Sequence, residues 1–84
     1  MAHVKVTPAA LKELAELPRV IRERIAKLFV RLEAWPVVSG AKPLSGNLAG
    51  WYRLRTGDYG VRFRIEGETV IVAKIGHRSD FYED

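Results

Sequence analysis

The chain has 84 residues, 48% of them hydrophobic, which is enough for one folded domain and too apolar for a disordered segment. It has no cysteine, so disulfides and thiolate metal sites are excluded, and its two histidines leave no convincing ligand set for zinc. The net charge of +4 favours RNA, DNA or an acidic protein as partner, and the lack of a signal peptide or of a run of ~20 apolar residues indicates a cytoplasmic location.

The start of the chain predicts a strand followed by a helix. Val4 and Val6 alternate with polar neighbours, which is typical of a short strand. Thr7-Pro8 then begins a helix, because threonine caps the first turn and proline lacks the N–H that would find no partner there. The helix ends at Leu17-Pro18, since a residue before proline avoids the helical conformation. Three residues are expected to share its apolar face: Leu11, Leu14 and Ala15.

A second helix is predicted from about Arg19 to Ala34, because its apolar residues recur at spacings of three and four and so lie on one side. Trp35-Pro36 ends this helix, and residues 36–50 form a loop that proline and glycine interrupt repeatedly. The two helices, joined at Pro18, therefore form a helical hairpin. The apolar side of the second helix consists of Ile21, Ile25, Leu28, Phe29 and Leu32.

The last third of the chain predicts three strands, over residues 51–56, 59–65 and 69–77, because aromatic and β-branched residues alternate there with polar ones. Gly57-Asp58 is a two-residue turn with glycine first, which is typical of a type II′ hairpin. The expected fold is therefore a single α+β domain over residues 1–84, with the order βααβββ. An N-terminal strand and a helical hairpin precede a three-stranded antiparallel segment, and the helices pack on one face of an antiparallel sheet.

The Gly57-Asp58 turn fixes the register of the first two of these strands. It pairs Thr56 with Tyr59 and, further along the hairpin, Arg53 with Arg62. Side chains alternate between the faces of a sheet, so one face is apolar and packs against the helices, whereas the other is rich in arginine. The apolar face contains Tyr52, Leu54, Val61, Phe63 and Ile65. The opposite face contains Trp51, Arg53, Arg55, Gly60, Arg62 and Arg64.

The turn at residues 66–68 decides where the third strand places its charges. With a three-residue turn, Lys74 and Arg78 join the arginine-rich face, and Val70 and Val72 share it. With a two-residue turn, Lys74 would instead lie against the helices. We favour the three-residue turn because it buries no lysine; the valines then either lie under a partner or stay partly exposed. The core-facing residues of this strand are Ile71, Ala73 and Ile75.

The arginine-rich face is interpreted as a phosphate-binding surface. No acidic residue of the three strands is expected on it, and arginine binds phosphate through two parallel hydrogen bonds while keeping its charge. Such a face suits RNA cleavage, in which the 2′-hydroxyl attacks the neighbouring phosphate and extra negative charge must be stabilised. For proton transfer the sequence offers His77 and Tyr82 near Arg78, because nearby arginines favour the phenolate form of a tyrosine.

Three segments of the sequence resemble the RelE/ParE toxin superfamily, and they occur in the family's order. Residues 42–46 (KPLSG) are similar to the family's KPL-G loop. Residues 50–59 (GWYRLRTGDY) are similar to G-YRLRVGDYR, and residues 75–82 (IGHRSDFY) are similar to VGHRREVY. The opening strand with its Thr7-Pro8 helix start also matches the family, so the resemblance covers nearly the whole chain.

The resemblance implies the toxin of a type II toxin–antitoxin system: a metal-independent endoribonuclease, or mRNA interferase, that cuts mRNA in the ribosomal A site and is held inactive by a cognate antitoxin. It implies no cofactor, a toxin–antitoxin hetero-oligomer, and mRNA and the ribosome as further partners. Carried over by position, Arg53, Arg55 and Arg78 match the family's phosphate-stabilising arginines, and Tyr82 matches its tyrosine base. Further RNA contacts are expected from Arg62, Arg64, Lys74 and His77.

Two positions depart from the RNA-cleaving members of the family. Gly60 stands where arginine is usual, and Ser79 where a second basic residue is common. Either Arg62 replaces the missing arginine, or the toxin is attenuated or altered at this position. An arginine at position 60 would add a phosphate donor, and we expect it to leave stability unchanged or slightly improved, since glycine weakens a strand. The alternative function is that of a ParE-like inhibitor of DNA gyrase without nuclease activity.

Overall fold

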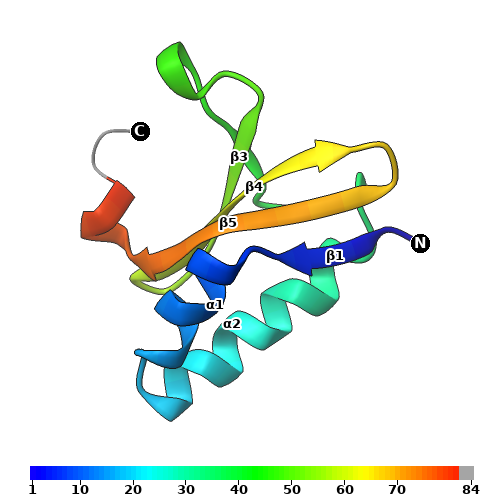
Figure 1. Cartoon of the computed structure of the whole chain (residues 1–84). Coiled ribbons are helices and arrows are strands. Elements are labelled where there is room, and N and C mark those ends of the chain that lie inside the picture. Colours follow the sequence, from blue (N-terminus) through cyan, green and yellow to red (C-terminus); the bar gives the residue numbers. More distant parts are fainter. Residues whose placement is uncertain (82–84) are drawn as a thin grey trace.

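A twisted sheet of five strands lies above two helices in the computed structural model, which describes residues 1–81 (Figure 1). The order of elements confirms the predicted α+β fold, and a two-residue strand and two short 3₁₀ turns are added to it. The elements are β1 (His3–Val6), α1 (Pro8–Ala15), α2 (Arg19–Leu32), β2 (Lys42–Pro43), η1 (Gly46–Leu48), β3 (Trp51–Thr56), β4 (Tyr59–Glu66), β5 (Thr69–His77) and η2 (Arg78–Phe81).

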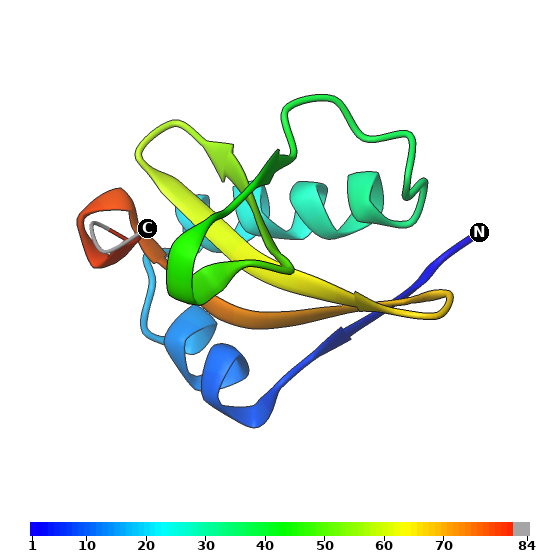
Figure 2. The same cartoon turned by 90° about the horizontal axis from the view of Figure 1, so that it is seen from above.

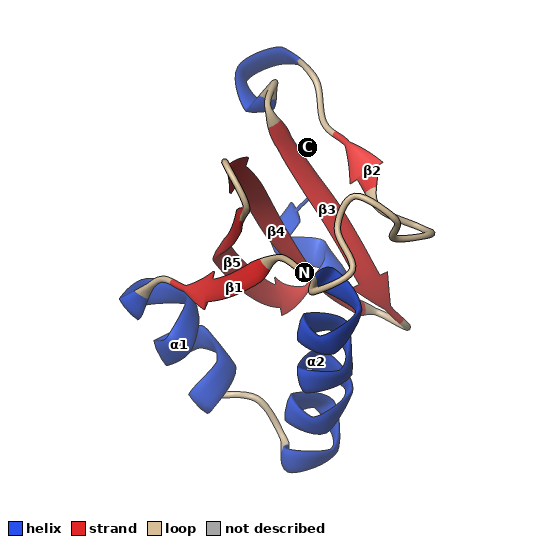
Figure 3. Cartoon of the chain, turned by 90° about the vertical axis from the view of Figure 1, so that its right-hand side faces the viewer, coloured by secondary structure: helices blue, strands red, loops and turns tan. Residues whose placement is uncertain are grey.

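The sheet is mixed rather than purely antiparallel. Its strand order is β1-β5-β4-β3-β2, so that β1 and β2 form its two edges (Figure 3). The predicted antiparallel arrangement holds from β2 to β5, and β1 adds a parallel pair with β5. A parallel neighbour needs a long crossover connection, which the helices and the other strands provide here. The pairing sets Val4 beside Val70 and Val6 beside Val72, which brings the apolar residues of both strands to the same face.

Helix α1 begins at the predicted threonine cap, where the amide of Ala10 donates to Thr7 Oγ1 at 3.2 Å. Its predicted apolar face is wrong at two of three positions, because Leu11 is 52% exposed and Ala15 is also exposed. The helix packs on β5 and buries Ala10 completely. Its inner face therefore runs through Ala10 and Leu14, which lie four residues apart and stack on one side of a helix.

Helix α2 buries the predicted apolar stripe through Ile25, Leu28 and Leu32, and it ends at Leu32 rather than at Ala34. In the view from above, β4 passes in front of α2 (Figure 2). One face of the sheet therefore packs on the helices, and the opposite face is turned away from them. No helix within residues 1–81 is long and apolar enough to cross a membrane. The buried core between helices and sheet consists of Ala10, Ile25, Leu28, Leu32, Leu54, Val61, Phe63, Val70, Val72 and Ile75.

The β3–β4 hairpin has the predicted register, with Thr56 opposite Tyr59 and Arg53 opposite Arg62. Gly57 adopts a φ of +60°, whereas no residue other than glycine has a positive φ within the described residues 1–81. A positive φ at the first of two turn positions alone is the type II′ geometry. The turn chemistry of Gly57 thus determines which side chains of both strands face away from the helices.

The β4–β5 turn has two residues, Gly67-Glu68, so the predicted three-residue turn is wrong. Val70 and Val72, which that turn would have exposed, are completely buried. Burying a valine side chain contributes about 1.5–3 kcal/mol, and the shorter turn gains this without burying Lys74, because the strand is irregular between Val72 and Lys74. Ile71, predicted in the core, is opposite Arg64 and faces away from the helices.

A β-bulge then reverses the alternation of faces along β5. Phe63 pairs with Val72, but its neighbour Arg62 pairs with Lys74, so Ala73 is an extra residue on β5. A bulge of this kind moves all later side chains of the strand to the other face. Lys74 therefore faces away from the helices, as predicted, although the turn before it is the shorter one. Ile75 is buried beneath the sheet, also as predicted.

Candidate phosphate-binding face

One cation from each of four neighbouring strands lies in a row across the face of the sheet that is turned away from the helices. Lys42 of β2 is paired with Arg53 of β3. Arg62 of β4 is paired with Arg53 on one side and with Lys74 of β5 on the other. Paired residues share a face, and three strand spacings of about 4.8 Å separate the first from the last by about 14 Å. We call these four residues the cationic row.

Three further cations adjoin the cationic row. Arg55 follows Arg53 by two positions on β3, and Arg64 follows Arg62 by two positions on β4, so both share its face. Arg78 begins η2 and is tied to the β3–β4 turn: its amide donates to the carbonyl of Asp58 at 2.6 Å, and its Nε lies 4.0 Å from Asp58 Oδ1. We call the cationic row together with Arg55, Arg64 and Arg78 the basic face.

Two aromatic rings hold the guanidinium groups at the centre of the basic face. The guanidinium carbon of Arg62 lies 6.0 Å from the centre of the Trp51 ring and 5.9 Å from that of Phe81. Arg64 lies 5.3 Å from the Trp51 ring, and the Lys74 ammonium lies 5.8 Å from the Phe81 ring. A cation above an aromatic face is attracted by it, typically by about 0.5–2 kcal/mol. The rings therefore restrict the positions of these cations before any ligand binds.

Acidic side chains contact the basic face at Arg64, Lys74 and Arg78, and one of them, Glu66, belongs to strand β4, so the expectation that no acidic residue of the strands would share this face is wrong. Glu66 at the end of β4 shares the face with Arg64 and accepts from its Nε at 2.8 Å. Glu13 of α1 comes from another element, and its Oε2 lies 3.8 Å from Lys74 Nζ. The alternation of β4 extends one residue further than predicted and brings Glu66 with it. Part of the positive charge at Arg64 and Lys74 is thereby balanced within the protein.

The structure brings five of the predicted site residues together on the sheet, with a sixth, Arg78, at its end. It does not bring His77 to this face. His77 is opposite Tyr59 on the side of the helices, where the two rings meet edge-on with centres 5.2 Å apart. Its Nδ1 accepts from the amide of Ser79 at 3.1 Å, which ends the strand. Tyr82 lies outside the described residues. The five residues on the sheet are Arg53, Arg55, Arg62, Arg64 and Lys74.

Lys42 belongs to the cationic row but was not predicted as a site residue. Its strand has only two residues, Lys42–Pro43, which is too short to produce an alternating pattern. Proline is tolerated there because β2 is an edge strand. The resemblance of residues 42–46 to a family loop was the only signal in the sequence that pointed to this position.

Gly60 lies on the basic face between Arg55 of β3 and Gly76 of β5. A Cβ atom at Gly60 would lie 2.9 Å from the carbonyl oxygen of Leu54 and 3.1 Å from Cγ of Arg55. A Cβ atom at this position would therefore force the backbone of β3 to shift, which is a structural reason for glycine here. This contact contradicts the expectation that arginine at position 60 would leave stability unchanged or improved.

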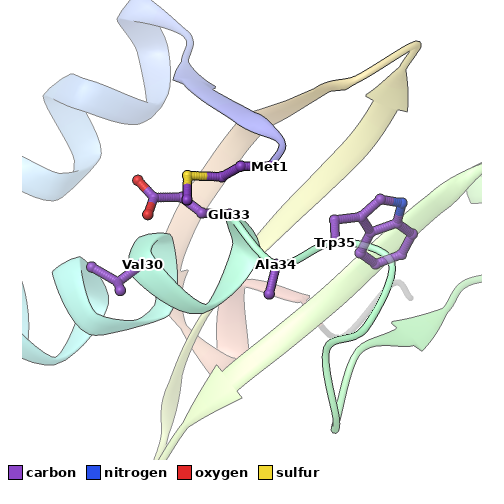
Figure 4. Close-up of a pocket in the computed structure, with 5 residues that line it drawn as sticks. All are labelled: Met1, Val30, Glu33, Ala34 and Trp35. Atoms are coloured by element: carbon purple, nitrogen blue, oxygen red, sulfur yellow. The ribbon is translucent and has the colours of Figure 1, made fainter.

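A pocket of about 400 Å³ lies elsewhere, between the N-terminus and the end of α2 (Figure 4). Its only charged side chain is that of Glu33, and it contains none of the predicted site residues. Within residues 1–81, no group of three or more histidine, aspartate and glutamate side chains is arranged to hold a metal ion. The pocket is lined by Met1, Val30, Glu33, Ala34 and Trp35.

Comparison with known proteins identifies relatives in both sequence and structure. Toxin RelG of Mycobacterium tuberculosis is 35% identical over 82 residues, which covers 94% of this chain and 93% of the relative. Toxin RelE3 of Methanocaldococcus jannaschii is 26% identical over 76 residues, covering 87% of this chain and 86% of the relative.

The fold is similar to that of solved toxin structures. The toxin–antitoxin complex RelBE2 of Mycobacterium tuberculosis contains a chain of 30% identity that matches with a TM-score of 0.82 over 92% of this chain and 98% of that one. The isolated RelE toxin of E. coli, at 22% identity, shares the fold with a TM-score of 0.76 over 99% of this chain and 93% of that one. A family model described as the ParE toxin of the type II toxin–antitoxin system parDE matches residues 4–82. The chain therefore belongs to the ParE toxin family of type II toxin–antitoxin systems, within the RelE/ParE superfamily that its three sequence segments predicted.

Proposed function

We propose that the protein is an endoribonuclease that cleaves mRNA in the ribosomal A site. The observation that carries this proposal is the cationic row, in which register alone sets four cations side by side. An RNA backbone lying across the strands would meet these cations in succession, and each arginine can donate two hydrogen bonds to a phosphate. The names of the relatives RelG and RelE3, both toxins, support the toxin role to which this activity would belong.

The proposed reaction is attack of a 2′-hydroxyl on the adjacent phosphorus with departure of the 5′-oxygen. Arg53, Arg55 and Arg78 are proposed to stabilise the additional negative charge on the phosphate oxygens. Tyr82 is proposed as the base that takes the proton of the 2′-hydroxyl. The remaining cations of the face, at Arg62, Arg64 and Lys74, would bind neighbouring phosphates and hold the RNA in place.

Cleavage of mRNA on programmed ribosomes, mapped by primer extension, tests this proposal. The purified protein is expected to cut within the codon in the A site and to leave the same mRNA largely intact without ribosomes. Cuts spread over naked and ribosome-bound RNA alike would argue for a nuclease that does not depend on the ribosome. No cuts in either sample would reject the nuclease.

A second candidate function is inhibition of DNA gyrase without nuclease activity. Two observations favour it: the matching family model is that of the ParE toxin, and Gly60 stands where an arginine donor would be expected in a nuclease. A gyrase supercoiling assay with the same protein separates the two candidates. Inhibited supercoiling together with intact mRNA would select the inhibitor.

Cleavage is expected to survive EDTA, because arginines on the basic face supply the positive charge that a metal ion would otherwise provide. The measurement compares cleavage before and after chelation, with magnesium kept just high enough for intact ribosomes and the free concentration of zinc held near zero. Activity that disappears under these conditions and returns with added zinc would contradict the proposed mechanism.

We also propose that a cognate antitoxin covers the basic face with carboxylates or apolar side chains and extends across the helices. The support is the net charge of +4 and the solved toxin–antitoxin complexes among the similar structures. Val70 and Val72, expected as part of this contact, are buried and excluded from it.

Association with such an antitoxin is expected to slow by about tenfold when salt is raised from low to high concentration, because attraction between opposite charges speeds encounter. Stopped-flow mixing measures the rate, and hydrogen exchange on the complex locates the contact. A complex in which exchange changes neither on the helices nor on β3 and β4 would contradict the proposed binding surface.

A further inference from the structure

The bulge in β5 exposes a backbone amide that a helix side chain takes up. Strand β1 ends at Val6, opposite Val72, so β5 has no strand neighbour on that side beyond this point. The amide of Ile75 donates instead to Oε1 of Glu13 at 2.9 Å, in a partly buried position. A backbone amide buried without a partner is costly. Glu13 therefore takes the place of the missing strand and stabilises the bulge.

The same carboxylate also contacts the last member of the cationic row. Oε2 of Glu13 lies 3.8 Å from Lys74 Nζ, and the two side chains are only 35% and 27% exposed. One acidic group thus binds the backbone at Ile75 and the side chain at Lys74. Because the bulge is what turns Lys74 toward the basic face, both contacts act on the position of the same ammonium group.

We propose that Glu13 is a positioning residue for phosphate binding: it holds the bulge that brings Lys74 to the basic face, and its charge competes with phosphate for the Lys74 ammonium. The inference rests on the proposed RNA-binding function of that face. It assigns to α1 a part in the site, although this helix packs on the other face of the sheet. Its two contacts have opposite effects on RNA binding and can be separated by substitution.

Binding of a short single-stranded RNA, measured by fluorescence anisotropy, separates the two contacts. Glu13→Gln keeps an oxygen for the Ile75 amide but removes the charge, and we expect it to raise affinity about threefold, the scale of a partly exposed ion pair. Glu13→Ala removes both contacts and is expected to bind more weakly than the wild type. The control is Glu16→Gln, the same charge change at an exposed residue just beyond α1.

A double-mutant cycle tests whether Glu13 acts through Lys74. In a Lys74→Gln background, Glu13→Gln should change affinity no more than Glu16→Gln does. An equal effect of Glu13→Gln and Glu16→Gln in the wild-type background would overturn the proposal, because Glu13 would then act only through the net charge of the protein. An effect of Glu13→Gln that persists in the Lys74→Gln background would also overturn it.

Hydrogen exchange at the Ile75 amide provides a readout that needs no RNA. We expect protection in the wild type and in Glu13→Gln, and exchange at least about tenfold faster in Glu13→Ala, since an amide that loses its partner opens more readily. Unchanged protection in Glu13→Ala would overturn the assigned role. A protein that binds RNA with this pattern of variants but does not cut it would reject the nuclease and leave the role of Glu13 intact.

Discussion

Arg78→Ala and Tyr82→Phe are each expected to slow mRNA cleavage on programmed ribosomes by about 10²–10³, the usual effect of losing one group that stabilises developing charge. Arg78 is held at the edge of the basic face by the hydrogen bond between its amide and the Asp58 carbonyl, a contact that alanine keeps. Its side chain is 55% exposed, and its ion pair with the exposed Asp58, at 4.0 Å, is long. Exposed ion pairs contribute little to stability, so removing the side chain should cost little. Tyr82 lies next to η2 in the sequence.

The matched control is Arg19→Ala, which removes the same charge from the exposed start of α2. In single-turnover measurements on the same ribosome preparation, the cleavage rate of Arg19→Ala should be close to that of the wild type. Thermal melts should be similar for all four proteins. Full toxicity of both Arg78→Ala and Tyr82→Phe at matched low expression would reject the site assignment.

Gly60→Ala is expected to destabilise the protein by about 1–3 kcal/mol, the usual cost of forcing additional atoms into a packed site. For a domain of roughly this size, each kcal/mol corresponds to a drop in Tm of about 4–8 °C. The cause is the distance of 2.9 Å between the new Cβ and the Leu54 carbonyl oxygen, which is backbone and cannot rotate away. Gly60→Arg carries the same clash, so a gain in phosphate contacts would come with a loss of stability.

Gly76→Ala is the matched control, because Gly76 is paired with Gly60 on the same face. A Cβ there would lie 2.6 Å from Oδ2 of Asp80, the free end of a flexible and exposed side chain. That carboxylate can turn aside, so the melting temperature should fall less than in Gly60→Ala. Equal melting temperatures of Gly60→Ala and the wild type would show that β3 relaxes without a loss of stability. The expectation that arginine at position 60 leaves stability unchanged would then stand.

The register of the β3–β4 hairpin could be predicted because one local feature determines it. Gly57 adopts the positive φ that a two-residue turn needs, and the pairing of Arg53 with Arg62 follows by counting back from the turn. The four arginines that β3 and β4 place on the basic face can therefore be located from sequence alone. Local turn chemistry and alternation are sufficient wherever a hairpin has no irregularity.

The β4–β5 hairpin could not be predicted in the same way, because two deviations compensate each other. The short turn at Gly67-Glu68 moves Lys74 to the wrong face, and the extra residue Ala73 moves it back. The alternation of polar and apolar residues along the sequence reveals neither change, since hydrophobic residues occupy both faces of this strand. The Ile75 amide, two residues beyond the bulge, is bonded by Glu13, which lies 62 positions away and is reached only through the tertiary fold.

The parallel pairing of β1 with β5 has a consequence for synthesis of the protein. Each pair in this ladder joins residues 66 positions apart, such as His3 and Thr69. Contacts of such long sequence separation are slow to form, and here they cannot form at all until β5 has left the ribosome. The cationic row needs the same strand for Lys74. The cationic row therefore cannot assemble on a nascent chain before β5 has been synthesised and released, so the proposed phosphate-binding surface appears only once the whole sheet has been translated.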